Sequence, residues 1–318
     1  MASRFSRLPT LEKNFFINAA SRLEPFDYLK GQERVQGYFY TPSTNHFYFS
    51  EAQKKKRIVL HFTAGHLQSD MNQLSQANYH VSVPFVVARD GKIFQLFYSK
   101  YWSHHLGLAS GNPGKIYDKE SIGIELCNYG WLKPVGQELE TIYSRQMRST
   151  GIPNPVDVYC NINDAEAYTQ IATPYRDQAY YASYTPAQIE SLIVLVRYLT
   201  ALYLIPREFL PEENRYLTNK TNMDFKGIVS HVNYRNSGKW DIGPTFNWPA
   251  LIEGTQSAQF IPVINPIRST RSRIRQPSES EFTQGKNQGS EYNPRKRTIL
   301  RTYDPFDFEI KPKQESAD

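Results

Sequence analysis

The sequence predicts an α/β domain, because runs typical of β-strands alternate along it with segments of helical periodicity. All four tryptophans and nearly all of the apolar patterning lie between about Thr10 and Gly254. A chain of 318 residues is long enough for one large domain or two smaller ones. Strands interleaved with helices are typical of a layered α/β architecture.

Four apolar runs rich in β-branched residues predict strands: residues 57–62, 80–87, 92–97 and 121–127. The second and third runs flank Asp90-Gly91, which is a strong signal for a hairpin turn. Pro84 has no amide hydrogen, so the second strand should have an unpaired or bulged position there. The basic run Lys54–Lys56 precedes the first strand, and we expect it to be a solvated lead-in rather than a nucleic-acid patch.

The clearest helix signal follows Thr185. Thr185 and Gln188 form a capping box, and Pro186 occupies the first helical position. Apolar residues then recur at helical spacing: Ile189, Leu192, Ile193, Val196, Leu199 and Tyr203. The pattern ends before Pro206. Two shorter helices are expected over residues 67–76 and 247–253, the second closed by Gly254.

Three other segments surround or interrupt this pattern. Residues 1–56 are expected to be an N-terminal extension that packs on the domain of residues 57–254. Residues 131–183 are rich in tyrosine and predict an irregular insertion packed by aromatic side chains. Residues 255–318 predict a flexible basic tail, because few apolar residues are available to offset the entropy cost of ordering. Between Pro266 and Arg301 the tail has nine Lys or Arg and three Glu, a surplus equal to the net charge of +6 of the whole chain.

Composition excludes several classes of protein. No run of about 18 apolar residues is present, so we expect no membrane-spanning helix. The first residues lack an apolar core, so we expect no Sec-type signal. Two cysteines, Cys127 and Cys160, are too few for a disulfide framework. The patterned region has no nucleic-acid recognition motif with the required spacing, so we expect no nucleic-acid partner despite the basic tail.

Two histidines and one aspartate have the pattern of a metal site. His61 lies at the end of the first predicted strand, and His231 ends a further short apolar run, residues 228–231. Asp241 follows in a turn that contains Gly and Pro. Two neutral imidazoles and a carboxylate suit Zn²⁺, and three protein ligands leave a fourth position for water. Taken alone, His61 would more often be a hydrogen-bonded structural histidine.

Five segments, in chain order, resemble the zinc-dependent N-acetylmuramoyl-L-alanine amidases of the amidase-2, peptidoglycan-recognition-protein and phage T7 lysozyme type. They are residues 58–61, 81–96, 104–107, 121–126 and 231–244. The separation of His231 from Asp241, with Lys239 two residues before the aspartate, strengthens the likeness. The resemblance implies a mixed central β-sheet flanked by helices.

The resemblance also implies roles for individual residues. It implies three zinc ligands: His61, His231 and Asp241. Glu125 matches the glutamate that acts as general base, Lys239 matches the lysine that supports the reacting carbonyl, and His105 matches a histidine of the substrate groove. Val83-Pro84 stands where the family often has Tyr or Ala followed by His, so a catalytic tyrosine is absent at that place.

The implied activity is hydrolysis of the amide that joins the lactyl group of N-acetylmuramic acid to L-alanine of the stem peptide. The alternative is a non-catalytic peptidoglycan-binding module, which ranks lower because all three ligands and Glu125 are present. Without a Sec signal, the enzyme would be made in the cytoplasm. It would reach the cell wall in the periplasm after lysis or by non-Sec delivery, as a phage endolysin or a delivered effector. The basic tail could then bind a carrier. A cytoplasmic amidase that recycles muropeptides is the other alternative.

Overall fold

The computed structural model describes residues 3–25, 35–108, 112–257, 302–303 and 310–311. The chain divides into two units, Met1–Pro262 and Val263–Asp318. In the second unit the described residues form two short antiparallel strands, β13 (Thr302–Tyr303) and β14 (Ile310–Lys311). The rest of the predicted basic tail lies outside the described residues. All other described helices and strands belong to the first unit.

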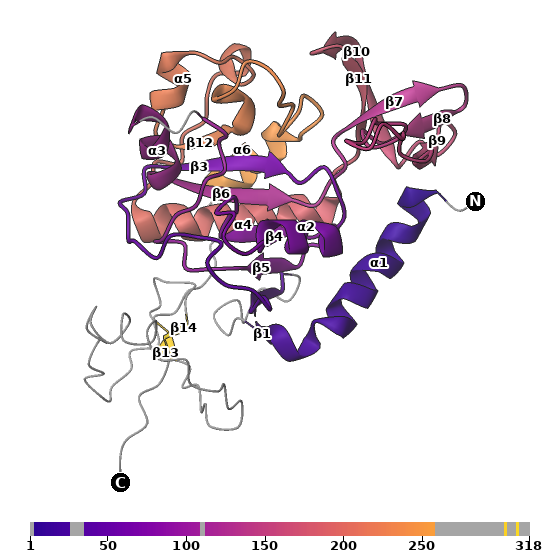
Figure 1. Ribbon diagram of the computed structural model, residues 1–318. Coiled ribbons are helices and arrows are strands. Elements are labelled where there is room, and N and C mark those ends of the chain that lie inside the picture. The colour runs from indigo at the N-terminus through magenta and orange to yellow at the C-terminus, as the bar shows by residue number, and fades with distance from the viewer. Residues whose placement is uncertain (1–2, 26–34, 109–111, 258–301, 304–309, 312–318) are drawn as a thin grey trace. The chain divides into compact units, whose positions relative to one another are not determined.

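The described residues of the first unit contain a mixed sheet of seven strands (Figure 1). In spatial order the strands are β1 (Leu23–Pro25), β2 (Gly37–Tyr40), β5 (Ile93–Gln95), β4 (Phe85–Val87), β6 (Ser121–Leu126), β3 (Arg57–Phe62) and β12 (Ile228–Ser230). The β4–β6, β6–β3, β3–β12 and β2–β5 pairs are parallel. The β4–β5 and β1–β2 pairs are antiparallel. The expected mixed central sheet is therefore confirmed.

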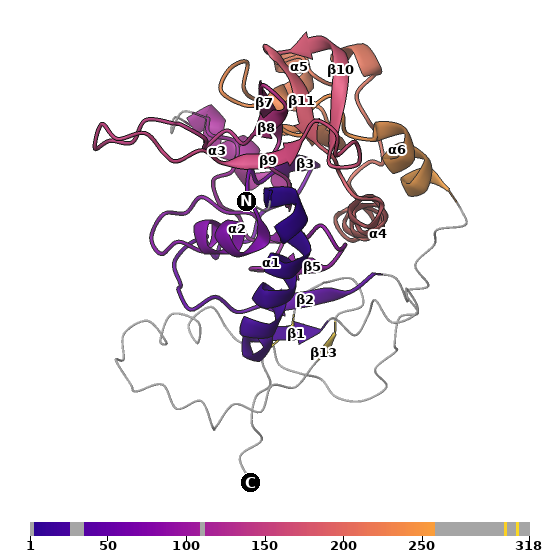
Figure 2. The same ribbon diagram turned by 90° about the vertical axis from the view of Figure 1, so that its right-hand side faces the viewer.

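Helices cover both faces of this sheet. They are α1 (Arg4–Asn18), α2 (Leu67–Leu74), α3 (Asn112–Lys119), α4 (Pro186–Tyr203), α5 (Lys220–Asp224) and α6 (Trp248–Gln256). Figure 2 shows α1 and α2 on one face and α4 on the other. Phe15 of α1 and Met71 of α2 share a buried cluster with Phe94 of β5. On the opposite face, Gln188 of α4 donates to the carbonyl oxygen of Cys127 at 3.0 Å. No described helix is long and apolar enough to cross a membrane.

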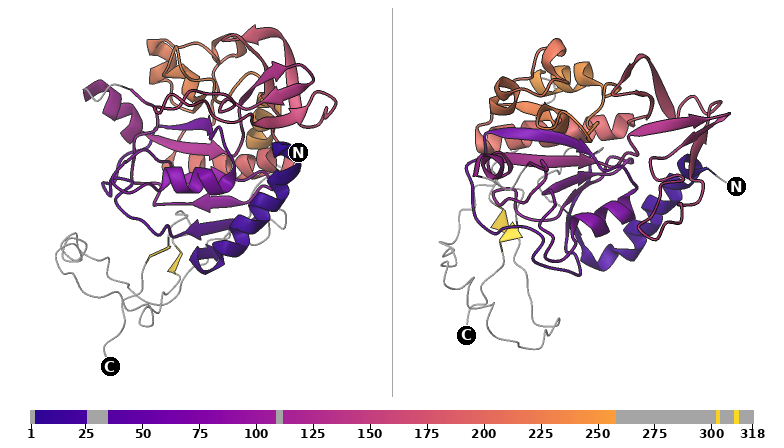
Figure 3. Two further views of the ribbon diagram at one scale, coloured as in Figure 1. Left: turned by 45° about the vertical axis from the view of Figure 1, so that its right-hand side comes forward. Right: turned by 45° about the horizontal axis from the view of Figure 1, so that its top comes forward.

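Residues 131–183, called the insertion below, form a second sheet instead of the expected irregular segment. All of these residues are described, and their five antiparallel strands lie in the order β10 (Tyr168–Tyr175), β11 (Gln178–Ala182), β7 (Trp131–Val135), β8 (Glu138–Glu140) and β9 (Val158–Asn161). Figure 3 shows these magenta to pink strands as a group apart from the central sheet. The β10–β11 turn places Arg176 and Asp177 at φ of 50° and 65°, the left-handed conformation that tight hairpin turns need. Because neither residue is Gly or Asn, the sequence lacks the usual turn signal. The aromatic packing is present, since Tyr159 and Tyr181 are fully buried.

The strongest local signals are confirmed. α4 begins with the predicted capping box, in which Thr185 and Gln188 each bind the backbone N–H of the other. The predicted hairpin joins β4 to β5, with Gly91 at a φ of 86°. β4 begins directly after Pro84, so the proline precedes the strand. α6 runs past Gly254 to Gln256, so this glycine does not end the helix as expected. Gly254 instead packs on Ile193 of α4 too closely for a side chain.

The basic run before β3 differs from expectation. Lys55 is 3% exposed, so it is not a solvated residue. Its Nζ donates to the carbonyl oxygens of Tyr101 at 2.7 Å, Lys119 at 2.9 Å and Ser121 at 3.2 Å. An ammonium group has three donors, and three carbonyl acceptors replace water here. Lys55 therefore joins the loop before β3 to two neighbouring segments.

Candidate active site

The carboxyl ends of two strands bring two histidines together. His61 lies near the end of β3, and His231 directly follows β12 at the start of a short 3-10 helix. The two strands are parallel neighbours with Leu60 opposite Ser230, so both histidines lie at the same edge of the sheet. Asp241, in the loop that follows, completes a group whose ligand atoms all lie within 4.8 Å of one another.

Three atoms of this group converge. Nδ1 of His61 lies 2.9 Å from Nδ1 of His231 and 3.1 Å from Oδ2 of Asp241. Nδ1 of His231 lies 2.8 Å from the same Asp241 oxygen. All three side chains are buried, with exposed fractions of 1% for His61, 2% for His231 and 3% for Asp241. Two imidazole nitrogens and one carboxylate oxygen in this arrangement form a donor set for a metal cation.

The outer nitrogens of the two imidazoles determine their tautomers. Nε2 of His231 donates to the carbonyl oxygen of Leu106 at 3.0 Å, which leaves a lone pair on Nδ1. On the other ring, Nε2 of His61 lies 2.9 Å from Nδ1 of His105, and Nε2 of His105 lies 2.8 Å from Oγ of Ser121. The Ser121 hydroxyl donates in turn to a backbone carbonyl, that of Tyr117, at 2.6 Å.

This chain of hydrogen bonds has one consistent direction. Because the Tyr117 carbonyl can only accept, Ser121 accepts from His105, and His105 accepts from His61. His61 therefore also carries its proton on Nε2 and directs the Nδ1 lone pair at the centre. Such partners of the outer nitrogen orient metal-binding histidines and set their tautomer.

The protonation states agree with this geometry. Burial lowers the pKa of His61 to about 4, with partial compensation by its hydrogen bond to Asp241. Burial also lowers the pKa of His105 well below its usual value. Although burial opposes ionisation of Asp241, His231 and His61 hold its pKa well below its usual range. A neutral imidazole at His61 beside an ionised Asp241 is the state that a bound cation requires.

Glu125 lies beside this group on the neighbouring strand. It is opposite His61 in the β3–β6 register. Its Oε2 is buried and has no hydrogen-bond partner among the described residues. Burial raises the pKa of Glu125 well above its usual value, the charge of Asp241 adds to this effect, and Lys239 opposes it. The carboxylate of Glu125 is therefore a strong proton acceptor. Its Oε2 receives no hydrogen bond from the described residues.

The structure brings the predicted site residues to one place. A cavity of about 470 Å³ is lined by five of them: His105, Glu125, His231, Lys239 and Asp241. His61, the sixth predicted residue, contacts His231, Asp241 and His105 as described above. His105 differs from a typical groove residue, because both of its ring nitrogens are engaged within the protein and it is only 9% exposed. His105 therefore supports the His61 ring through a hydrogen bond, a role that the sequence did not indicate.

Side chains of the insertion hold the loop that carries Asp241. Arg176, in the β10–β11 turn, donates to the carbonyl oxygen of Lys239 and, at 2.9 Å, to that of Arg235. Nε1 of Trp240 donates back to the carbonyl oxygen of Arg176 at 3.2 Å. Just after β11, the Tyr184 hydroxyl donates to the carbonyl oxygen next to Asp241, that of Ile242, at 2.7 Å. Sequence reasoning missed Arg176 and Tyr184, because neither belongs to a motif.

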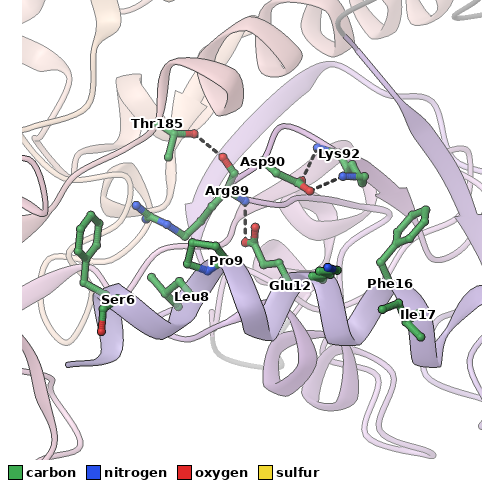
Figure 4. A pocket seen from close by; sticks show the side chains of 12 residues that line it. Ser6, Leu8, Pro9, Glu12, Phe16, Ile17, Arg89, Asp90, Lys92 and Thr185 are labelled. Carbon is green, nitrogen blue, oxygen red and sulfur yellow. Dashed lines mark hydrogen bonds and ion pairs between the residues drawn. The ribbon is translucent and has the colours of Figure 1, made fainter. Parts of the chain in front are cut away.

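A larger cavity of about 620 Å³ lies elsewhere, between α1 and the β4–β5 hairpin (Figure 4). Apolar side chains of α1, including Leu8 and Phe16, form much of its wall. Glu12 accepts a hydrogen bond there from the backbone N–H of Arg89 at 2.9 Å, as Figure 4 shows. None of the six predicted site residues lines this cavity, so its size does not make it the site of chemistry.

Comparison with known proteins agrees with the geometry. The sequence model of the Amidase_2 family, described as N-acetylmuramoyl-L-alanine amidase, matches residues 51–244. The curated N-acetylmuramoyl-L-alanine amidase AmiD of Escherichia coli (strain K12) is 26% identical over 203 residues, which cover 62% of this chain and 52% of AmiD. The chain thus spans about half the length of this curated relative.

Three solved structures illustrate the similarity of the chain to known folds. The complex of E. coli AmiD with anhydro-N-acetylmuramic acid-L-Ala-D-γ-Glu-L-Lys is 20% identical, with a TM-score of 0.40 and coverage of 84% of this chain and 76% of that one. PlyL is 16% identical, with a TM-score of 0.38 and coverage of 70% and 97%. AmpDh3 from Pseudomonas aeruginosa is 16% identical, with a TM-score of 0.36 and coverage of 64% and 61%.

The matched region contains every residue of the group described above, from His61 on β3 to Asp241 in the loop after β12. It also covers more than half of the chain. On this evidence the chain belongs to the Amidase_2 family of N-acetylmuramoyl-L-alanine amidases.

Proposed function

We propose that this protein is a zinc-dependent peptidoglycan amidase that hydrolyses the bond between the lactyl group of N-acetylmuramic acid and L-alanine. The observation that carries the proposal is the convergence of two imidazole nitrogens and a carboxylate oxygen beside Glu125 and Lys239 in one cavity. The name of the curated relative, an N-acetylmuramoyl-L-alanine amidase, supports the same bond as the target.

His61, His231 and Asp241 would hold the metal ion. Their donor set of two nitrogens and one oxygen suits zinc, and three protein ligands are typical of its catalytic sites. The burial of the three side chains and the outward hydrogen bonds of both imidazoles fit such a role. When bound, zinc supplies Lewis acidity, which activates water and polarises a carbonyl group.

Glu125 and Lys239 would carry out the proton transfer and the charge stabilisation. The raised pKa of Glu125 suits it to take a proton from the attacking water and return it to the departing amine of L-alanine. General acid–base help of this kind is typically worth about 10²- to 10⁴-fold. Lys239 lines the same cavity, so its ammonium group can stabilise the negative charge that develops on the carbonyl oxygen.

The test is digestion of purified sacculi, followed by mass spectrometry of the released products. Intact stem peptides with a free L-alanine amine should appear, and a chelator should abolish their release. Glu125→Gln should retain zinc but lose turnover by about 10²-fold or more. Glu138→Gln, an exposed glutamate of β8, is the matched control and should behave as wild type. Wild-type turnover by zinc-loaded Glu125→Gln would exclude Glu125 as the proton carrier.

The biological context extends this proposal. We propose a lytic or delivered enzyme that acts on the wall itself, with cytoplasmic recycling of muropeptides as the alternative. Parallel assays on sacculi and on soluble muropeptides separate the two, because a recycling enzyme would cleave only the soluble fragments. Attachment of residues 255–318 to a carrier stays a prediction, since nearly all of that segment lies outside the described residues.

A further inference from the structure

Two cavities meet at Glu125. The first, of about 470 Å³, contains His231, Asp241 and Lys239. The second, of about 460 Å³, extends from Glu125 to the start of α1 and to the loop before β9. Both share the same four lining residues: Thr63, Leu74, Val81 and Glu125. A substrate whose reacting amide lies at Glu125 can therefore extend in two directions, one into each cavity.

The two cavities differ in chemistry. The first has two indole rings in its wall, those of Trp131 and Trp240. The second has ionisable side chains, among them Arg4 and Asp157, which pair at 2.6 Å. Asp70 also lines the second cavity, and its Oδ2 is buried without a hydrogen-bond partner among the described residues.

The indole wall is built into the fold. The ring centroids of Trp131 and Trp240 are 5.5 Å apart, with planes inclined at 54°. Trp240 is held by its hydrogen bond to the carbonyl oxygen of Arg176, and Trp131 is paired in register with the buried Tyr181. Both tryptophans nevertheless remain partly exposed. Because these partly exposed rings line the first cavity, a ligand in that cavity can contact them.

We propose that Trp131 and Trp240 form the subsite for the sugar ring of the substrate, and that the stem peptide leaves Glu125 through the second cavity. This inference rests on the proposed function, because it concerns the two halves of that substrate. The sugar half is uncharged, since its lactyl carboxyl group is part of the amide. A pyranose ring presents a face of C–H groups, which can stack on an indole.

The lining of the two cavities favours this orientation of the substrate. The stem peptide carries carboxylates, and the face of an aromatic ring is the negative side of its quadrupole. A carboxylate would therefore be repelled by the faces of the two indole rings. The second cavity instead offers ionisable groups of both signs, Arg4 beside Asp157 and Asp70, to the charged and polar groups of a stem peptide.

The test measures sugar binding separately from cleavage. The probe is the peptide-free disaccharide of N-acetylglucosamine and N-acetylmuramic acid, with its lactyl carboxyl group capped as a methylamide, titrated into the full chain by calorimetry. Trp131→Ala should bind it about tenfold more weakly. Trp131→Leu, which keeps apolar bulk without a ring face, should show a similar loss and covers the case in which the alanine variant does not fold. Tyr79→Ala removes an exposed aromatic ring outside both cavities and should bind as wild type.

Kinetics on two substrates complete the test. Trp131→Leu should raise KM for a muramyl peptide but leave KM unchanged for the same peptide carrying only a lactyl group. An equal rise on both substrates, or unaltered binding of the disaccharide, would overturn the proposal. If wild type cleaves both substrates with the same KM, the sugar subsite is overturned but the proposed amidase function stands. Disaccharide binding lost in Trp131→Leu, in a protein that cleaves neither substrate, would support the subsite and contradict the amidase.

Discussion

Replacing His105 by alanine should weaken zinc binding, because His105 accepts the hydrogen bond that orients His61. Nε2 of His61 donates to His105 at 2.9 Å, which leaves the Nδ1 lone pair directed at His231 and Asp241. Without His105, the N–H group of His61 loses its acceptor, or the ring moves its proton to Nδ1, where a metal would bind. Both outcomes disfavour the metal-bound state.

The burial of His61 determines the size of this effect. The side chain is 1% exposed, so water cannot readily replace the lost acceptor. A buried donor without a partner costs about 1–3 kcal/mol. This cost corresponds to a loss of about 5- to 150-fold in affinity. The range includes the loss of about 10- to 100-fold that is typical when the partner of a metal-binding histidine is removed.

The assay is competition for zinc with a chromogenic chelator, which yields the dissociation constant of each variant. His104→Ala is the matched control, because this adjacent histidine pairs with Asp118 at 3.0 Å and not with the ligand group. Ser121→Ala should cause a smaller loss in the same direction, since it removes the acceptor of His105. Equal zinc affinity of wild type and His105→Ala would refute the reasoning, and so would an equal loss in His104→Ala.

Two further predictions concern stability and the loop that carries Asp241. Burial raises the pKa of Asp70 from 3.8 to about 7, so its contribution to the free energy of unfolding is intact below about pH 4 and is lost as pH rises to 7. The loss is at most about 4 kcal/mol. Asp70→Asn should flatten the pH dependence of the free energy of unfolding, measured by urea unfolding. A pH dependence equal to that of wild type would contradict this. Arg176→Ala removes the donors to the carbonyls of Lys239 and Arg235 and should lower kcat/KM by about tenfold. Arg176→Lys should be intermediate in the same assay, whereas wild-type kinetics of Arg176→Ala would show that the loop does not need this support.

The two histidines of the ligand group could be predicted from the sequence pattern, because His61 and His231 mark the ends of apolar strands. Glu125, Lys239 and His105 could be assigned only through the resemblance to the amidase family. Parallel neighbours such as β3 and β12 bring their carboxyl ends to one edge, so His61 and His231 had to meet if the two strands paired. The tautomers could not be predicted. They depend on His105, Ser121 and the carbonyl of Leu106, whose contacts with the ligands form only in the folded chain.

The errors in the predicted fold have the same origin. Lys55 was expected in solvent because its sequence neighbours are basic, but its three acceptors come from segments 46 to 66 residues away. The insertion has little periodicity and contains prolines and polar residues, which predicts an irregular segment, and the Arg176-Asp177 turn has no glycine to signal a hairpin. The burial of Lys55 and the sheet of the insertion both arise from contacts between distant parts of the chain. The local sequence pattern cannot show such contacts.

The insertion is part of the candidate active site and not an addition to its surface. Two carbonyl oxygens of the Asp241 loop, those of Lys239 and Ile242, are bound by Arg176 in the insertion and by Tyr184 directly after it. Trp131, the first residue of the same sheet in the sequence, lies beside Trp240 in the wall of the cavity. One sheet thus positions a candidate metal ligand and supplies an indole for the proposed sugar subsite. Metal affinity and sugar binding should therefore be coupled through the insertion, because a shift of the β10–β11 turn moves Trp240 and Asp241 together.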